Sequence, residues 1–157
     1  MFIDRILDTE TSHLQLFFND DWESPYRIIS YGHDIEASWL LHEAALVLGD
    51  KALLDEVEPR VVDIAEAATE GSLTGAGMLY EQHVDTASID ADRHWWVQAE
   101  AIVGYINLYQ HFDDRLSLSR AVQCWEFVKR HLIDRENGEW YWSLRADGSV
   151  NRNEDKA

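Results

Sequence analysis

Residues 34–48, which read DIEASWLLHEAALVL, decide the fold. Apolar side chains occur nearly all round this stretch, and Gly49 and Asp50 follow it directly. The composition predicts a single helix over 34–48, and apolar residues on every side are typical of a helix that neighbours surround. The breaker pair at 49–50 predicts its end.

Three further helices are expected downstream, over 51–69, 94–110 and 118–132. Helices 51–69 and 118–132 each carry a single apolar stripe, whereas helix 94–110 is apolar nearly all round, like helix 34–48. A four-helix bundle would have four similar stripes. Alternating inner and outer helices instead indicate an all-α fold, a partial α/α toroid made of helical hairpins.

The remaining segments are expected to be short connections and extended pieces. Residues 1–30 have the pattern of an extended lead-in, and 71–93 of a long connection that either roofs a cleft or is mobile. A short β-hairpin is expected near 138–150, with its turn at Ala146-Asp147-Gly148. No Pro- or Gly-rich linker divides the chain, so 1–157 is interpreted as a single domain.

Composition excludes several classes of protein. Thirteen Lys and Arg against thirty Asp and Glu give a net charge of −17, which opposes binding to nucleic acid or to an anionic membrane surface. Cys124 is the single cysteine, so no internal disulfide or cysteine-based zinc site is expected. Residues 1–8 do not resemble a signal peptide, and no apolar run is long enough for a membrane span. We therefore expect a cytoplasmic globular protein.

The chain contains seven Trp, six Tyr and five Phe residues, 11% of the sequence. These aromatics fit either a large core or a groove that stacks on the apolar faces of sugar rings. Composition alone favours the core, so the placement of the aromatic residues has to decide between the two.

Ionisable groups and aromatics occur together at the start of both predicted inner helices. His33, Glu36 and Trp39 are spaced i, i+3, i+6, and Trp96 and Glu100 are spaced i, i+4. Polar groups on helices that are otherwise apolar all round need buried partners or a cavity to face. The spacing therefore indicates a candidate site at this end of the helices.

Structural roles are the alternative, and spacing alone slightly favours them. Asp34 could cap the first helix, Glu36 could complement its dipole, and His33 could be a hydrogen-bonded structural imidazole. No metal is expected, because His33-x-x-Glu36 lacks a second histidine at ligand spacing. The other histidines are interpreted as ordinary residues and several acids as surface charge: His42, His111 and His131; Glu43, Asp50, Asp55 and Glu56.

The two motif blocks resemble a known family. GHDIEASWLL at 32–41, followed by RHWWVQAE at 93–100, resembles the cellobiose 2-epimerase branch of the N-acylglucosamine 2-epimerase superfamily. The resemblance extends through 13–22 and 139–150 and so covers nearly the whole chain. It implies an (α/α)6 barrel and inversion of C2 of the reducing-end glucose of a β-1,4-linked disaccharide, without metal or cofactor.

The resemblance also implies a role for each matching residue. His33 corresponds to one of two histidines that exchange the C2 proton, and Glu36 and Glu100 correspond to acids beside the reacting sugar. Aromatic and polar neighbours are implied to bind the substrate, a small sugar: Trp39, Trp95, Trp96, Asp34 and His94.

The sequence departs from the family in its length. It corresponds to less than half of a family member, and the second proton-exchanging histidine would lie beyond residue 157. We therefore expect an incomplete (α/α)6 barrel fragment that is inactive as an epimerase alone. Its exposed apolar flanks are expected to cause homo-oligomerisation or to bind a complementing chain.

Three other functions remain as alternatives. An aldose–ketose isomerase acting on mannose needs a single base, and a glycosidase would use Glu36 and Glu100 as its carboxylate pair but leaves His33 without a role. A non-catalytic sugar-binding remnant is the third.

Overall fold

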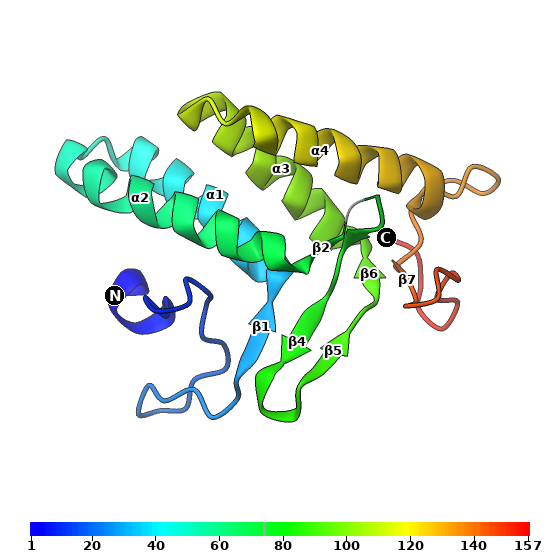
Figure 1. The fold of residues 1–157 in the computed structure, drawn as a ribbon, viewed down its shortest axis with the longest axis horizontal. Coiled ribbons are helices and arrows are strands. Elements are labelled where there is room, and N and C mark those ends of the chain that lie inside the picture. The colour runs from blue at the N-terminus through cyan, green and yellow to red at the C-terminus, as the bar shows by residue number, and fades with distance from the viewer. Residues whose placement is uncertain (74) are drawn as a thin grey trace.

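Two helical hairpins form the body of the protein, and small sheets lie at one end of them (Figure 1). The computed structural model describes residues 1–73 and 75–157. The first hairpin joins α1 to α2, and the second joins α3 to α4, which continues into a π-helical turn, η4. Their bounds are Tyr31–Leu48 (α1), Lys51–Ala68 (α2), Trp95–Phe112 (α3), Arg115–Phe127 (α4) and Val128–Leu132 (η4).

The two hairpins meet through α1 and α3, which lie against each other as well as against their own partners. Glycines permit this approach at two places. A Cβ at Gly104 would lie 2.6 Å from Cγ1 of Ile35, and a Cβ at Gly32 would lie 2.6 Å from Cη2 of Trp96. Both distances are shorter than any van der Waals contact allows. The apolar core therefore forms where the four helices converge, around Ile35, Val61, Val97, Ala101, Tyr105 and Ala121.

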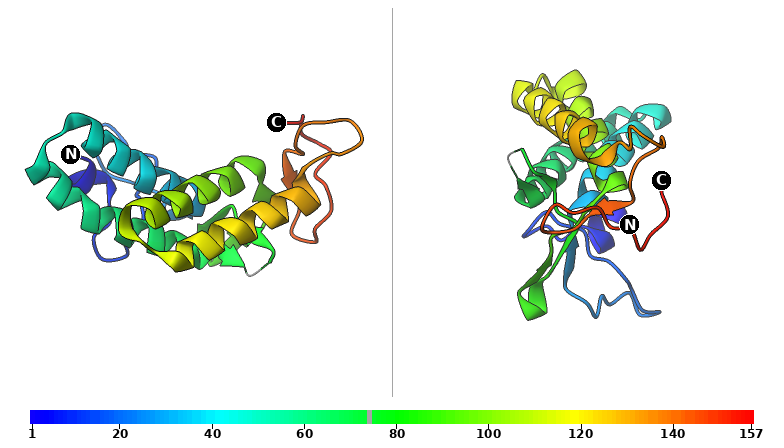
Figure 2. Two further views of the ribbon diagram at one scale, coloured as in Figure 1. Left: turned by 90° about the horizontal axis from the view of Figure 1, so that it is seen from above. Right: turned by 90° about the vertical axis from the view of Figure 1, so that its right-hand side faces the viewer.

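Short antiparallel strands cover the end of the molecule at which α1 and α3 begin (Figures 1 and 2). One sheet has the order β1-β4-β5, with Ser30 of β1 opposite Glu81 of β4. Two further pairs are β2 with β3 and β6 with β7. The strands are β1 (Ile28–Ser30), β2 (Ser72–Leu73), β3 (Gly77–Met78), β4 (Glu81–His83), β5 (Ser88–Asp90), β6 (Arg93–His94) and β7 (Ser143–Leu144). Short helical turns are η1 (Phe2–Ile6), η2 (Thr69–Gly71) and η3 (Val84–Thr86).

All four predicted helices are confirmed, but two of them begin earlier than expected. Helix α1 begins at Tyr31 rather than Asp34, because it follows β1 directly and tolerates Gly32 in its first turn. Helix α4 begins at Arg115 rather than Leu118, because the side chain of Asp114 caps it by accepting a hydrogen bond from the N–H of Leu116.

The long connection expected over 71–93 is built largely of short strands. It contains β2 to β5 and the first residue of β6, and β4 and β5 form an antiparallel pair beside β1. The turn near Gly148 is confirmed, since the N–H of Arg145 donates to the carbonyl of Ser149 at 2.8 Å. The strand before this turn, however, pairs mainly with β6, a partner distant in sequence that local pattern cannot reveal.

Helices α1 and α3, the predicted inner helices, carry exposed apolar residues, which is the pattern expected for part of a ring. Val47 and Leu48 of α1 are 85% and 69% exposed, and Val103 of α3 is 43% exposed. Among the described residues, no helix combines the length and the apolar character that a membrane span requires.

Gly104→Ala tests the close approach of α1 and α3. Overpacking a core costs about 1–3 kcal/mol, which exceeds the roughly 1 kcal/mol that alanine gains over glycine within a helix. We therefore expect a lower free energy of unfolding in urea. Val103→Ala, at the exposed neighbouring position, should change it by less than about 0.5 kcal/mol. Equal stability of the wild type and the Gly104 variant would contradict the close approach.

Candidate functional site

His33 lies in the first turn of α1, where its exposed imidazole meets Trp96 from the first turn of α3. The two ring centroids are 5.0 Å apart and the planes are tilted by 58°. The same imidazole also contacts the residue before α1, since its Nδ1 lies 2.7 Å from Oγ of Ser30. The imidazole is therefore held from two elements while the residue stays open to solvent.

A second contact between the same helices holds an acid in place. The indole Nε1–H of Trp39 on α1 donates a hydrogen bond of 2.8 Å to Oε2 of Glu100 on α3. This bond uses one oxygen of the carboxylate and fixes the indole at the same time. The two helices thus share a polar contact one to two turns beyond His33.

Glu36 lies between these contacts along α1 and is half-buried. Burial raises the pKa of its carboxyl, and the negative charge of Glu100 raises that pKa further, while His33 opposes the shift. The carboxyl therefore keeps its proton at higher pH than an exposed glutamate does. We call these five residues the His33 cluster: His33, Glu36, Trp39, Trp96 and Glu100.

Tyr80, which precedes β4, extends the cluster towards β6. Its ring stacks on His94 with centroids 4.0 Å apart and meets the edge of Trp96 at 6.3 Å. Burial lowers the pKa of His94, so its imidazole is neutral near pH 7. Tyr80 therefore links His94 to the cluster, and the sequence did not assign it because it lies in the connection expected over 71–93.

Trp95 lies outside the His33 cluster. Successive residues on a helix point about 100° apart, so Trp95 and Trp96 cannot face the same partner. Trp95 instead meets Trp140 and Trp142 from the C-terminal segment, at centroid distances of 6.4 and 6.5 Å.

Asp34 is buried and does not cap α1, so that interpretation is wrong: Ser30 occupies the N-cap position, and Asp34 lies within the first turn. Its carboxylate accepts the N–H of Leu14 at 2.9 Å and lies 2.7 Å from Nδ1 of His13. Nε2 of His13 in turn lies 3.5 Å from Glu70. Asp34 therefore holds the N-terminal segment against α1 rather than facing the open side.

The other polar residues singled out in the sequence lie away from the cluster. His42 is buried, and its ring centroid is 4.7 Å from that of His111, further along α1 and α3. Asp50 is exposed but is more than surface charge, since it caps α2 through the N–H of Ala52. Within the described residues, no group of three or more His, Cys, Asp or Glu side chains could hold a metal ion.

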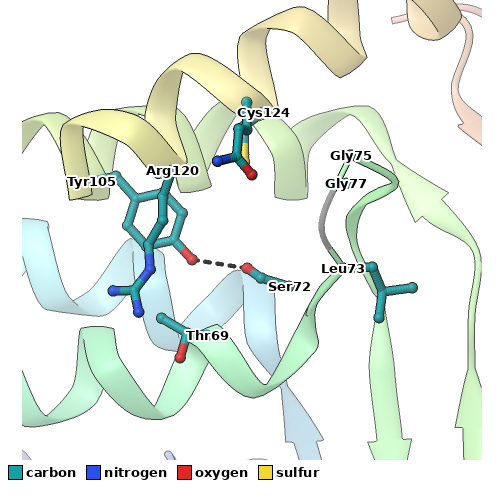
Figure 3. Close-up of a pocket in the computed structure, with 9 residues that line it drawn as sticks. Thr69, Ser72, Leu73, Gly75, Gly77, Tyr105, Arg120 and Cys124 are labelled. Atoms are coloured by element: carbon teal, nitrogen blue, oxygen red, sulfur yellow. Dashed lines mark hydrogen bonds between the residues drawn. The ribbon is translucent and has the colours of Figure 1, made fainter. Parts of the chain in front are cut away.

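A pocket of about 190 Å³ lies elsewhere, beside β2, β3, α3 and α4 (Figure 3). Tyr105 bonds there to Ser72 at 2.9 Å, and Arg120 is paired with Glu66 at 3.0 Å. Burial raises the pKa of the Cys124 thiol to about 11, so no thiolate forms there near neutral pH. The described residues that line this pocket include no histidine and no acid, unlike the His33 cluster.

The fold and the cluster together define a class of protein: an α/α toroid that carries an imidazole, two acids and indoles at the start of its inner helices. The family model of N-acylglucosamine 2-epimerase (GlcNAc 2-epimerase) matches residues 1–156. The chain belongs to this family.

Individual relatives agree with the family assignment. A cellobiose 2-epimerase from Bacteroides fragilis is 61% identical over 157 residues, 100% of this chain and 40% of that protein. A solved sugar epimerase from a ruminal bacterium is 35% identical with a TM-score of 0.92, covering 98% of this chain and 39% of its own. A cellobiose 2-epimerase structure from Bacillus thermoamylovorans is 39% identical with a TM-score of 0.86, over 96% and 38% of the two chains. The chain thus spans about 40% of the length of these relatives, and its fold is the corresponding part of the (α/α)6 toroid.

Asp34→Asn tests the buried anchor through its pH dependence. Burial on its own lowers the pKa of His13, but the hydrogen bond and charge of Asp34, with Glu70, outweigh burial and raise that pKa above 6.5. A raised pKa contributes stability that is complete below pH 6.5 and is lost as the pH rises through the folded-state value. We expect the wild-type free energy of unfolding to fall between pH 6 and pH 9, and to fall less in the variant.

Urea unfolding at both pH values measures this difference, and groups that titrate alike in the wild type and the variant cancel in the comparison. His13→Gln removes the same titration and serves if the Asp34 variant does not fold. An identical fall in the wild type and in both variants would rule out the anchor.

Proposed function

We propose that this chain carries the C2 proton-exchange centre of a sugar 2-epimerase, and that its substrate is a β-1,4-linked glucose disaccharide such as cellobiose. The observation that carries the proposal is the exposed imidazole of His33 against Trp96, beside Glu36 and Glu100, in a chain 61% identical to a cellobiose 2-epimerase.

His33 acts as the base in this proposal. In the open-chain sugar the C2 proton lies next to the aldehyde, so its removal moves the C2–H electron pair into an enediolate that extends to the C1 oxygen. Imidazoles have an ordinary pKa of about 6.5 and therefore accept and return protons near neutral pH. Return of the proton to the same face restores the substrate, whereas inversion needs delivery to the opposite face.

In this proposal the acids stabilise the negative charge of the enediolate, and the indoles hold the sugar rings. Burial and the charge of Glu100 raise the pKa of Glu36, which favours its protonated form, and in that form it donates a hydrogen bond to the oxygen that becomes negative. Trp39 and Trp96 offer flat apolar faces to the sugar rings. Trp39 also orients Glu100 through its indole N–H.

Delivery of a proton to the opposite face is assigned to the rest of the toroid, because this chain spans about 40% of its curated relative. We therefore propose that the chain alone exchanges the C2 hydrogen with solvent without forming the mannose epimer.

Deuterium exchange tests this function directly. The purified chain is incubated with cellobiose in D2O, and C2 deuteration and epimer formation are followed by NMR. We expect deuterated cellobiose without epimer, and a loss of roughly 10²–10⁴-fold in exchange rate in His33→Gln, the range that a general base contributes.

His131→Gln is the matched control, because His131 is also exposed and its ring lies against Phe127, not in the cluster. It should exchange at the wild-type rate. Absence of C2 deuteration by the folded wild type, or undiminished exchange in His33→Gln, would refute the proposal.

Other products would indicate the alternative functions. Fructose formed from mannose would indicate an aldose–ketose isomerase, the activity named for a solved structure that shares this fold at 19% identity. Glucose released from cellobiose would indicate a glycosidase. Binding of cellobiose, detected by tryptophan fluorescence, without exchange would indicate a sugar-binding protein.

We also propose that further helices of the toroid cover exposed apolar residues of α1 and α3, namely Leu40, Val47, Leu48 and Val103. The support is that the matching solved epimerase continues well beyond the 39% of its chain that aligns here. In the absence of those helices, apolar surface of this kind favours self-association. Light scattering should therefore give a mass above the 18.2 kDa of one chain, and a monodisperse monomer would contradict the proposal.

A further inference from the structure

Ser30 occupies the N-cap position of α1 but does not act as a cap. A serine in this position normally accepts a hydrogen bond from an N–H of the first helical turn, which stabilises the helix by about 1 kcal/mol. The side chain of Ser30 makes no such bond. Its hydroxyl instead lies 2.7 Å from Nδ1 of His33, although Ser30 is only 2% exposed. The usual capping interaction is replaced by a contact with the imidazole.

The backbone around Ser30 is well fixed, which makes this contact directional. Ser30 is the last residue of β1 and pairs with Glu81 of β4, and β4 is held on its other side by β5. Trp96 contacts the same imidazole from α3, and the absence of a side chain at Gly32 lets Trp96 lie close to the backbone of α1. The ring of His33 is therefore located by a strand on one side and by a helix on the other.

We propose that Ser30 is a positioning residue that keeps a proton on Nδ1 of His33, so that Nε2 is the nitrogen that exchanges protons with substrate. This inference rests on the proposed function for the identity of the substrate, but the state of the ring can be measured without it. The two nitrogens of an imidazole lie on different edges of the ring, and a neutral ring protonated at Nδ1 must have a free lone pair at Nε2.

The same hydrogen bond serves both states of the base. In the neutral ring, Nδ1–H donates to Oγ of Ser30 while Nε2 accepts the C2 proton. After the transfer the imidazolium still donates Nδ1–H to the same oxygen, and this bond is stronger because the donor is charged. The ring therefore need not turn during the exchange.

The protonation state of each ring nitrogen is visible in the ¹⁵N spectrum of the histidine side chains. The spectrum is recorded on the intact chain at a pH high enough for the ring to be neutral. His33→Gln assigns the signals by their disappearance. We expect the wild-type signals of His33 to show Nδ1 protonated and Nε2 unprotonated. In Ser30→Ala we expect a mixture of the two tautomers, and a C2 exchange rate roughly 10–100-fold lower, by analogy with the loss of a partner that orients a metal-bound imidazole.

Ser38→Ala is the matched control. Ser38 is likewise a buried serine of α1 with a single hydroxyl bond, 2.7 Å to the carbonyl of Ile35, and it makes no contact with His33 among the bonds of the described residues. It should cost similar stability and leave the signals of His33 unchanged.

The outcomes separate this inference from the proposed function. A wild-type His33 protonated at Nε2, or the same tautomer in the wild type and in Ser30→Ala, overturns the role of Ser30 even if C2 exchange is observed. The expected change of tautomer supports that role even if cellobiose is not exchanged, a result that would refute the proposed function alone.

Discussion

The close approach of α1 and α3 is the constraint on which the rest of the structure depends. Gly32 and Gly104 leave no room for a side chain, so Trp96 rests on the start of α1 and Ile35 rests on the middle of α3. Cores are packed at crystal-like density, and a single methyl group at either place would have to displace its neighbours. Helix α1 ends at Leu48 and α3 begins at Trp95, so 46 residues of chain lie between them (49–94). This contact nevertheless brings the two helices to a common face.

The chemistry of the cluster follows from that contact. The indole of Trp39 can reach Glu100, and the imidazole of His33 can reach Trp96, only if the two helices are held side by side. The same proximity places the charge of Glu100 near enough to Glu36 to raise the pKa of its carboxyl. An acid whose pKa is raised and an imidazole that is open to solvent therefore arise from the same packing.

The sequence predicts the repeating elements well and the isolated contacts poorly. Helical periodicity and the stops at Gly49 and Gly71 suffice for four helices, and the i, i+3, i+6 spacing suffices to place His33 and Glu36 together. The strands within 71–93 are only two or three residues long, too short to show a period of two, and the pairing of Arg93 and His94 with Ser143 and Leu144 joins residues far apart in the chain. Ser30 joins the site at the end of β1, and Tyr80 joins it directly before β4. A serine three residues before a histidine is a weak signal without that geometry.

The most direct test of the common face is a titration of the ¹⁵N-labelled chain with cellobiose, following the indole N–H signals. If the first turns of α1 and α3 form one sugar-facing surface, the signals of Trp39 and Trp96 shift together with a single dissociation constant. Trp125, which is 41% exposed on α4, serves as the internal reference, and its signal is expected not to shift. Shifts at Trp125 equal to those at Trp39 and Trp96, or no shift at either of the latter, would contradict the existence of that surface.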